Sequence, residues 1–248
     1  MIWEASKGPE HIGLLQGRLF RLVESQGQIA TLGYVDTLEE QALLEELLDS
    51  VKPPYPADTD TLHYLLKSPF RYPPLRWGSR FGRTHEPSLF YGGGTVHTTL
   101  AESAYYRFVF WYSMEGSSPK DRIRSEHTLF SARYHTPAGV RLQQPPFAQH
   151  LGELTHPSHY LPCQLLGSAM RAAGVQAFEY PSARDPEHGH CIGLFEPGAF
   201  RSRQPDNTSQ WLCELSAQAV SFKQIATNTL TSFMLPDFLV DGNLPLPA

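Results

Sequence analysis

The sequence is poor in cysteine, in charged residues and in long apolar runs, and each shortage excludes a class of protein. Its three cysteines, Cys163, Cys191 and Cys213, include no C-x-x-C pair, which favours free thiols in a reducing compartment over a disulfide framework. The longest apolar run, residues 108–112, is much shorter than the roughly 18 residues that a membrane-spanning helix needs. Residues 1–7 lack the basic and then apolar pattern of a signal peptide. We therefore expect a cytoplasmic protein that does not bind a membrane.

Charge is scarce, and its balance is slightly acidic. Charged residues make up 18% of the 248 residues, and 20 Lys and Arg against 25 Asp and Glu give a formal net charge of −5. Nucleic-acid-binding domains usually carry a clustered basic surface, so we expect no direct nucleic-acid binding. Hydrophobic residues make up 41% of the chain, which is enough for the core of one large domain or two small ones.

Several motifs that identify common enzyme classes are missing. Neither G-x-x-x-x-G-K-[ST] nor G-x-S-x-G occurs, and the glycine run at 92–94 does not fit G-x-G-x-x-G. The densest histidine cluster, His188 and His190 before Cys191, matches no known zinc spacing. We therefore expect no metal and no resident cofactor, and a zinc hydrolase built on these histidines is the weakest alternative.

The expected helices and strands mix without a regular βαβ order, which indicates an α+β protein. Helices are expected at residues 37–50, 59–67, 99–114 and 160–173, and strands at 88–91, 124–135, 175–180 and 191–195. Residues 14–23 fit either a strand or a short helix, and residues 137–139 fit a turn. We divide the chain into a mainly helical extension at residues 1–68, packed on the core, and a second domain at residues 69–248.

Four short motifs stand in order in the second domain. They are Gly-Ser-Arg-Phe at 78–81, Leu-Phe-Tyr at 89–91, Thr-Thr-Leu-Ala-Glu at 98–102 and Tyr-Pro-Ser-Ala-Arg at 180–184. Arg80 and Tyr91 are eleven residues apart, as are Tyr91 and Glu102. Over residues 69–200, this order resembles the RES-domain family, the toxins of RES–Xre toxin–antitoxin modules.

The resemblance implies a fold like that of the ADP-ribosyltransferases, with mixed sheets, flanking helices and a C-terminal tail. It implies that NAD+ is the substrate rather than a cofactor, and that NAD+ is cleaved at its nicotinamide–ribose bond. The acceptor of ADP-ribose stays open between water, phosphate and a protein side chain. The implied partner is an Xre-like helix-turn-helix antitoxin that blocks the active site.

A carboxylate and a hydroxyl in these motifs fit that chemistry. Cleavage of an N-glycosidic bond builds positive charge on the ribose, as in glycoside hydrolysis, and Glu102 is the carboxylate assigned to stabilise it. Ser182 can hydrogen-bond the ribose or Glu102 and so position them. A plainer interpretation is open for each residue. Thr99 to Glu102 also fits a capping box at a helix N-terminus, and a serine after a proline, as at Ser182, is typical of a turn.

Arginine and tyrosine residues supply the predicted contacts to NAD+. Arg71 or Arg80 can clamp the diphosphate with its guanidinium group, and Tyr91 can hold the flat nicotinamide cation. Tyr72 and Arg184, in the same stretches, complete the predicted binding set. Arg71 could instead pair with an acidic neighbour, Arg80 could be an ordinary surface residue, and Tyr91 could belong to the core. The predicted catalytic residues are Glu102, Arg80, Tyr91 and Ser182.

We therefore predict an NAD+-consuming toxin that acts as an NAD+ glycohydrolase or phosphorylase. A protein ADP-ribosyltransferase that uses NAD+ is the close alternative. A catalytically inactive module that only binds the antitoxin is the alternative from another class. The helix that carries Glu102 continues with aromatic residues around most of its circumference, from Tyr105 to Tyr112, and we expect these residues to be core.

Overall fold

The structure, a computed structural model, describes residues 1–25, 34–116 and 120–247. Its helices are α1 (Ile2–Ala5), α2 (Leu38–Ser50), α3 (Tyr64–Arg71), α4 (Val96–Tyr112), α5 (Leu151–Leu154) and α6 (Leu161–Ala172). Its strands are β1 (Gly13–Glu24), β2 (Phe90–Gly93), β3 (Ile123–Arg141), β4 (Ala177–Pro181), β5 (His190–Leu194), β6 (Asn207–Leu215), β7 (Ala219–Gln224) and β8 (Leu230–Met234). No helix within the described ranges is long and apolar enough to cross a membrane.

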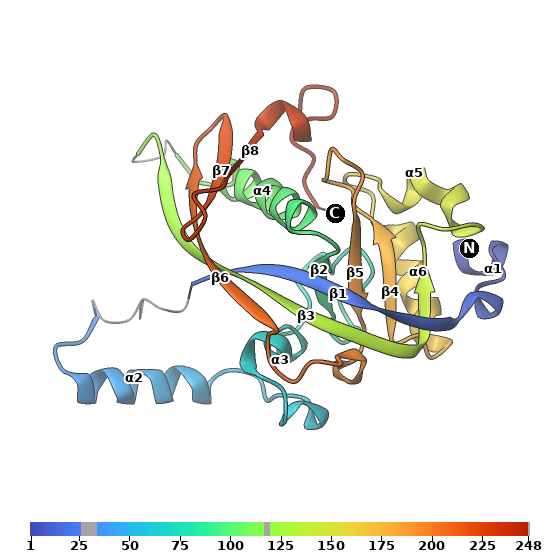
Figure 1. Ribbon diagram of the computed structural model, residues 1–248, viewed down its shortest axis with the longest axis horizontal. Coiled ribbons are helices and arrows are strands. Elements are labelled where there is room, and N and C mark those ends of the chain that lie inside the picture. Colours follow the sequence, from blue (N-terminus) through green and yellow to red (C-terminus); the bar gives the residue numbers. More distant parts are fainter. Residues whose placement is uncertain (26–33, 117–119, 248) are drawn as a thin grey trace.

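The strands form one eight-stranded sheet in the order β1-β2-β5-β4-β3-β6-β7-β8, and β1 also pairs with β3. β3 is parallel to β4 and antiparallel to β1 and β6. The strands β1, β2, β5, β4 and β3 therefore form a closed ring of neighbours, and β6, β7 and β8 extend the sheet from β3 (Figure 1). The ring brings Tyr91 on β2, Cys191 on β5 and Tyr180 on β4 onto adjacent strands.

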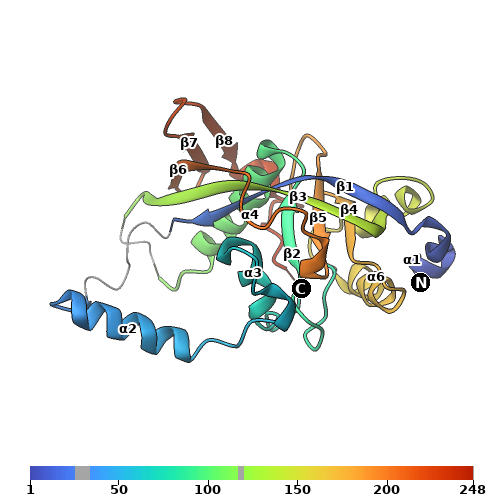
Figure 2. The same ribbon diagram turned by 60° about the horizontal axis from the view of Figure 1, so that its bottom comes forward.

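Helices cover both faces of the central strands. On one face, α4 packs Leu100, Tyr105 and Phe108 against β6, β7 and β8 (Figure 1). On the other face, α3 packs Leu66 and Phe70 against β1, β2 and β3 (Figure 2). A third cluster joins α1, α5 and α6 to β4 and β5. The predicted α+β class, a mixed sheet with flanking helices, is confirmed.

The segment at residues 1–68 contains a strand of the central sheet as well as helices. β1 pairs along its length with β3, so the choice that the sequence leaves open for residues 14–23 is resolved as a strand. Side chains alternate between the two faces: Leu19 joins the cluster under α3, and Phe20 packs on the one under α4. The prediction that residues 1–68 form a mainly helical extension is therefore wrong for β1, which is a strand of the central sheet.

The last part of β3 runs through residues 137–139, where the sequence predicts a turn. The register of β1 shifts between Gly13 and Leu15, opposite this segment. Pro137 therefore lies at an irregularity of the ladder, where a residue without an N–H is tolerated. Gly139 lets the two strands approach closely, because a Cβ atom there would collide with Leu15. Close pairing with β1 thus overrides the local turn signal.

Helix α2 stands apart from the sheet (Figures 1 and 2), and most of its side chains are exposed. It begins with a capping box, in which the Glu40 N–H donates to Thr37 Oγ1 (3.1 Å) and the Thr37 N–H donates to Glu40 Oε2 (3.2 Å). The helix predicted at residues 37–50 is confirmed. Near its end, the Asp49 carboxylate pairs with Arg71 of α3 at 3.1 Å.

Candidate active site

A cavity of about 500 Å³ opens between β1, β2, α4 and the loop before β2. This volume lies within the range of small-molecule sites. The charged side chains among its described lining residues are three arginines and one glutamate: Arg21, Arg80, Arg184 and Glu102. Aromatic side chains form much of the remaining wall: Tyr72, Trp77, Tyr91, Tyr106, Tyr160 and Tyr180.

Glu102 enters the cavity from the second turn of α4. The N-cap of this helix is Thr95, whose hydroxyl accepts the Thr98 N–H at 3.0 Å, so the capping box expected at Thr99 is wrong. Glu102 Oε1 instead accepts the Ser182 hydroxyl at 2.5 Å. Within the described part of the chain, Oε2 has no hydrogen-bond donor. The carboxylate is thus oriented on one side and available to a ligand on the other.

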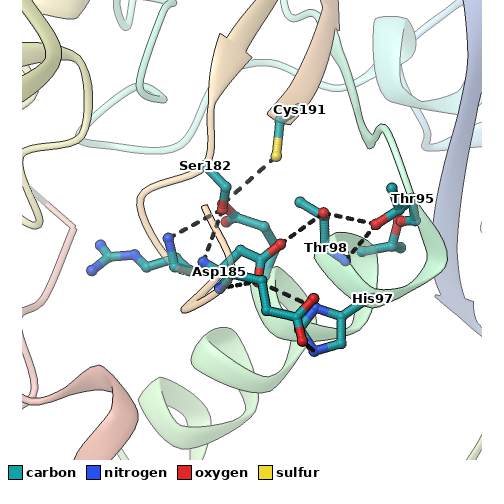
Figure 3. A network of polar contacts seen from close by, with 10 residues as sticks. Thr95, His97, Thr98, Ser182, Asp185 and Cys191 are labelled. Carbon is teal, nitrogen blue, oxygen red and sulfur yellow. Dashed lines mark hydrogen bonds and ion pairs between the residues drawn. The ribbon is translucent and has the colours of Figure 1, made fainter. Parts of the chain in front are cut away.

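Ser182 and Cys191 approach Glu102 from the ends of two adjacent strands (Figure 3). Ser182 follows β4, and Cys191 lies on β5 with its Sγ 3.7 Å from Glu102 Oε1. Burial, and then the nearby charge of Glu102, raise the pKa of the Cys191 thiol well above its usual value. The thiol therefore stays protonated and can donate weakly to the carboxylate.

Tyr91 is both a wall of the cavity and part of the packed interior. Its hydroxyl accepts the Phe81 N–H at 3.0 Å and lies 3.0 Å from Ser79 Oγ. Its ring meets the edge of Tyr180, with the ring centres 6.2 Å apart. Burial raises the pKa of Tyr91 to about 12, so the hydroxyl stays neutral. The two interpretations that the sequence leaves open for this residue are compatible.

Arg80 and Arg184 also line the cavity, and both are held by the segment before α6. Arg80 donates to the carbonyl oxygens of Leu154 (3.2 Å) and His156 (2.8 Å), and its guanidinium lies 4.4 Å from the ring centre of Tyr160. Arg184 donates to the Pro157 carbonyl oxygen. In the part of the chain that the structure describes, neither arginine pairs with a carboxylate. Both positive charges therefore remain available to an anion.

Arg21 of β1 is a third such arginine, and the sequence motifs do not include it. It donates to the Tyr91 carbonyl oxygen at 2.8 Å and lies 4.7 Å from the ring centre of Phe90. Burial lowers its pKa to about 10, so it stays charged at neutral pH, and no described carboxylate pairs with it. The signal in the sequence is its spacing of two residues from Leu19 and from Val23, which places a charge on the same, buried face of a strand as these two apolar residues.

Arg71 does not line the cavity, although Tyr72 beside it does. Its guanidinium donates to the Pro53 carbonyl oxygen, pairs with Asp49, and lies 4.3 Å from the ring centre of Tyr55. α3 ends at Arg71, and Tyr72 is already extended, so their side chains leave the chain in different directions. The structure thus matches the plainer interpretation of Arg71, pairing with an acidic neighbour.

The mouth of the cavity exposes aromatic side chains. Tyr72 is 46% exposed, Trp77 41% and Tyr106 52%. The prediction that the aromatic residues of α4 are core is therefore wrong for Tyr106, and also for Phe110 and Tyr112 further along the helix, although it is right for Tyr105 and Phe108. Neighbouring residues of a helix point about 100° apart, so Tyr105 packs inward while Tyr106 faces the cavity.

The histidines at 188 and 190 do not form a metal centre with their neighbours. Among the described residues, no group of three or more His, Cys, Asp or Glu side chains could hold a metal ion. A different histidine, His97, lies beside the loop at 182–189, with its Nδ1 3.2 Å from the Asp185 carboxylate.

Comparison with known proteins adds a family. Residues 53–216, more than half of the chain, match the family model described as the RES domain. No curated protein is similar enough to match. Among solved structures, a chain of the crystal structure of the M. tuberculosis MbcT-MbcA toxin-antitoxin complex is 11% identical, with a TM-score of 0.47, over 87% of this chain and 92% of that chain.

Proposed function

The chain belongs to the RES domain family, and from this premise we propose that it is the toxin of a toxin–antitoxin module, a cytoplasmic enzyme that consumes NAD+. The reaction is cleavage of the nicotinamide–ribose bond, with water or phosphate as acceptor. The observation that carries the proposal is Glu102, held by Ser182 in a cavity that three arginines line without a described carboxylate partner.

The carboxylate supplies the chemical step. As nicotinamide leaves, positive charge grows on the ribose, and a fixed negative charge stabilises that state more than the ground state. Glu102 suits this role because the bond from Ser182 holds Oε1, while Oε2 has no donor among the described residues. Orientation by a preformed hydrogen bond lets the carboxylate act without rearranging during the reaction.

The arginines supply binding. NAD+ carries two phosphate charges and one positive nicotinamide ring, and three guanidinium groups with one carboxylate match this pattern. Guanidinium groups bind phosphate oxygens through paired N–H donors, and we assign Arg21, Arg80 and Arg184 to the diphosphate. We assign the nicotinamide to the face of Tyr91, because an aromatic ring attracts a flat cation.

A protein ADP-ribosyltransferase is the second candidate, and the exposed mouth favours it. Tyr72, Trp77 and Tyr106 offer a protein surface apolar contacts beside the reacting bond. The same surface suits an antitoxin that closes the cavity, and we propose an Xre-like helix-turn-helix protein as this partner. A chain that binds the antitoxin without turnover is the remaining alternative.

Nicotinamide release from NAD+ tests the proposal. The purified chain and its Glu102→Gln variant are incubated with NAD+, with and without inorganic phosphate. Release that depends on Glu102 is expected, and faster release with phosphate identifies a phosphorylase. ADP-ribose attached to added protein identifies a transferase. No release under any of these conditions would leave the inactive binding module.

A further inference from the structure

The direction of the Ser182 hydroxyl is fixed by the backbone that follows it (Figure 3). Its oxygen accepts the N–H groups of Arg184 (3.2 Å) and Asp185 (3.0 Å). A hydroxyl group has two lone pairs and one hydrogen. Because both lone pairs are used, the hydrogen is directed to Glu102 Oε1, which lies 2.5 Å away. The contact to Glu102 therefore depends on where the backbone N–H groups at 184 and 185 are held.

The side chain of Asp185 holds that backbone. Its carboxylate is 1% exposed, and Oδ1 lies 3.2 Å from His97 Nδ1. Oδ1 also accepts the Glu187 N–H at 3.0 Å, and Oδ2 accepts the Thr98 hydroxyl at 2.8 Å. Asp185 is not among the described residues that line the cavity. Its bond with Thr98 instead fastens the loop at 182–189 to the first turn of α4, and its bond with the Glu187 N–H holds the loop itself.

The helix fastened in this way is the one that carries Glu102. Thr98 and Glu102 are four residues apart and so lie on the same side of α4. The loop therefore contacts one helix face at two places, through Thr98 and through Glu102. Gly189 shows how closely they fit, because a Cβ atom there would collide with Thr98 Oγ1 and with Asp185 Oδ2.

We propose that Asp185, bound to Thr98, is a positioning residue that directs the Ser182 hydroxyl to Glu102. The inference rests on the proposed function, because cleavage of NAD+ is the reaction that this alignment serves. The pair acts on the transition state through the orientation of Glu102. Neither Thr98 nor Asp185 lines the cavity, so we expect loss of the pair to lower kcat and to leave KM nearly unchanged.

The Thr98→Val variant tests this role with little change in side-chain volume. It removes the hydroxyl that donates a hydrogen bond to Asp185. We expect kcat for nicotinamide release to fall about tenfold, with KM changed less than twofold. Thr98→Ser restores the hydroxyl and should restore kcat. Thr128→Val on β3 is the matched control, because its hydroxyl bonds Gln210 of β6 and neither residue lines the cavity. If Thr98→Val does not fold, Asp185→Asn replaces it, because an amide offers one acceptor oxygen where the loop uses two.

A double-mutant cycle separates positioning from general damage to the fold. If the pair acts through Ser182, Thr98→Val has less than a twofold effect in a Ser182→Ala background. If the two losses multiply, the proposal is wrong. A fall in kcat/KM that comes from a higher KM, with kcat unchanged, would also overturn the proposal.

A crystal structure of the Thr98→Val variant keeps this inference independent of the proposed function. We expect Ser182 Oγ to leave hydrogen-bond distance of Glu102. An unchanged distance would overturn the positioning role, whether or not the wild type is active. Failure of the wild type to release nicotinamide, with Ser182 displaced in the variant, would instead overturn the reaction and keep the positioning role.

Discussion

At the inner wall of the cavity, Glu102 is held by a hydrogen bond from Ser182, whereas at the mouth Tyr72, Trp77 and Tyr106 are 41% to 52% exposed. The inner wall comes from β4, β5 and α4, which the sheet and its register fix against one another. The mouth comes partly from the loop before β2, which contains Tyr72-Pro73-Pro74.

The difference separates two tasks. A reacting carboxylate must already point in the right direction, because reorienting it during the reaction costs rate. Aromatic side chains at a mouth instead provide contact area for a ligand or a partner protein. On the proposed function, changes to the inner wall lower kcat, and changes to the mouth alter binding.

Among changes to the inner wall, replacement of Glu102 by Gln has the largest expected effect on activity. The amide keeps the shape of the side chain and loses its negative charge, so kcat for nicotinamide release should fall about 10²–10³-fold. KM should change little, because the charge acts mainly on the transition state. Glu39→Gln, on exposed α2, is a control of the same chemistry and should match the wild type. Near-normal turnover by Glu102→Gln would remove Glu102 from the mechanism.

Replacement of Arg21 tests the proposed contact between β1 and the diphosphate of NAD+. Arg21→Ala removes a charged donor that has no described carboxylate partner, and KM for NAD+ should rise by about tenfold to a hundredfold. kcat should change less than threefold. Arg21→Lys keeps the charge without the planar fork and should give an intermediate KM. Thermal unfolding of both variants checks that the strand still packs. An unchanged KM in both would exclude a phosphate contact.

Arg21 also marks a limit of the sequence motifs. The spacing from Arg80 to Tyr91 and Glu102 is local, and the structure brings these three residues around one cavity, with Ser182 hydrogen-bonded to Glu102. Arg21 lies on a strand that reaches the cavity only because β1 pairs with β2 and β3. Such pairing between distant segments cannot be seen in local motifs. The sequence itself carries only a weak signal for Arg21, a charged residue on the buried face of a strand.

Helix α4 shows a second limit. Local pattern places its start near residue 99, where Thr99 and Glu102 have the spacing of a capping box. An earlier threonine, Thr95, caps the helix instead. This shift of one turn moves Glu102 from the helix end to a position where a side chain from a distant loop, Ser182, can reach it. That contact depends on the fold, and the helical periodicity could not predict it.

Replacement of Trp77 at the mouth should have a smaller effect. Trp77 is 41% exposed and takes no part in the Ser182–Glu102 hydrogen bond. Trp77→Ala should raise KM for NAD+ about threefold and leave kcat within twofold, measured by steady-state nicotinamide release. A loss of kcat as large as that of Glu102→Gln would mean that mouth and inner wall do not have separate tasks.

Replacement of Arg71 should have the smallest effect on the reaction. The sequence offers Arg71 and Arg80 equally as phosphate clamps, but only Arg80 lines the cavity. Arg71 is occupied by Asp49 and by the ring of Tyr55. Arg71→Ala should therefore leave kcat and KM for NAD+ within twofold, while Arg80→Ala raises KM. The lost contacts should appear instead as faster hydrogen exchange in α2, because the Asp49 ion pair joins that helix to α3. A rise in KM as large as that of Arg80→Ala would return Arg71 to the binding site.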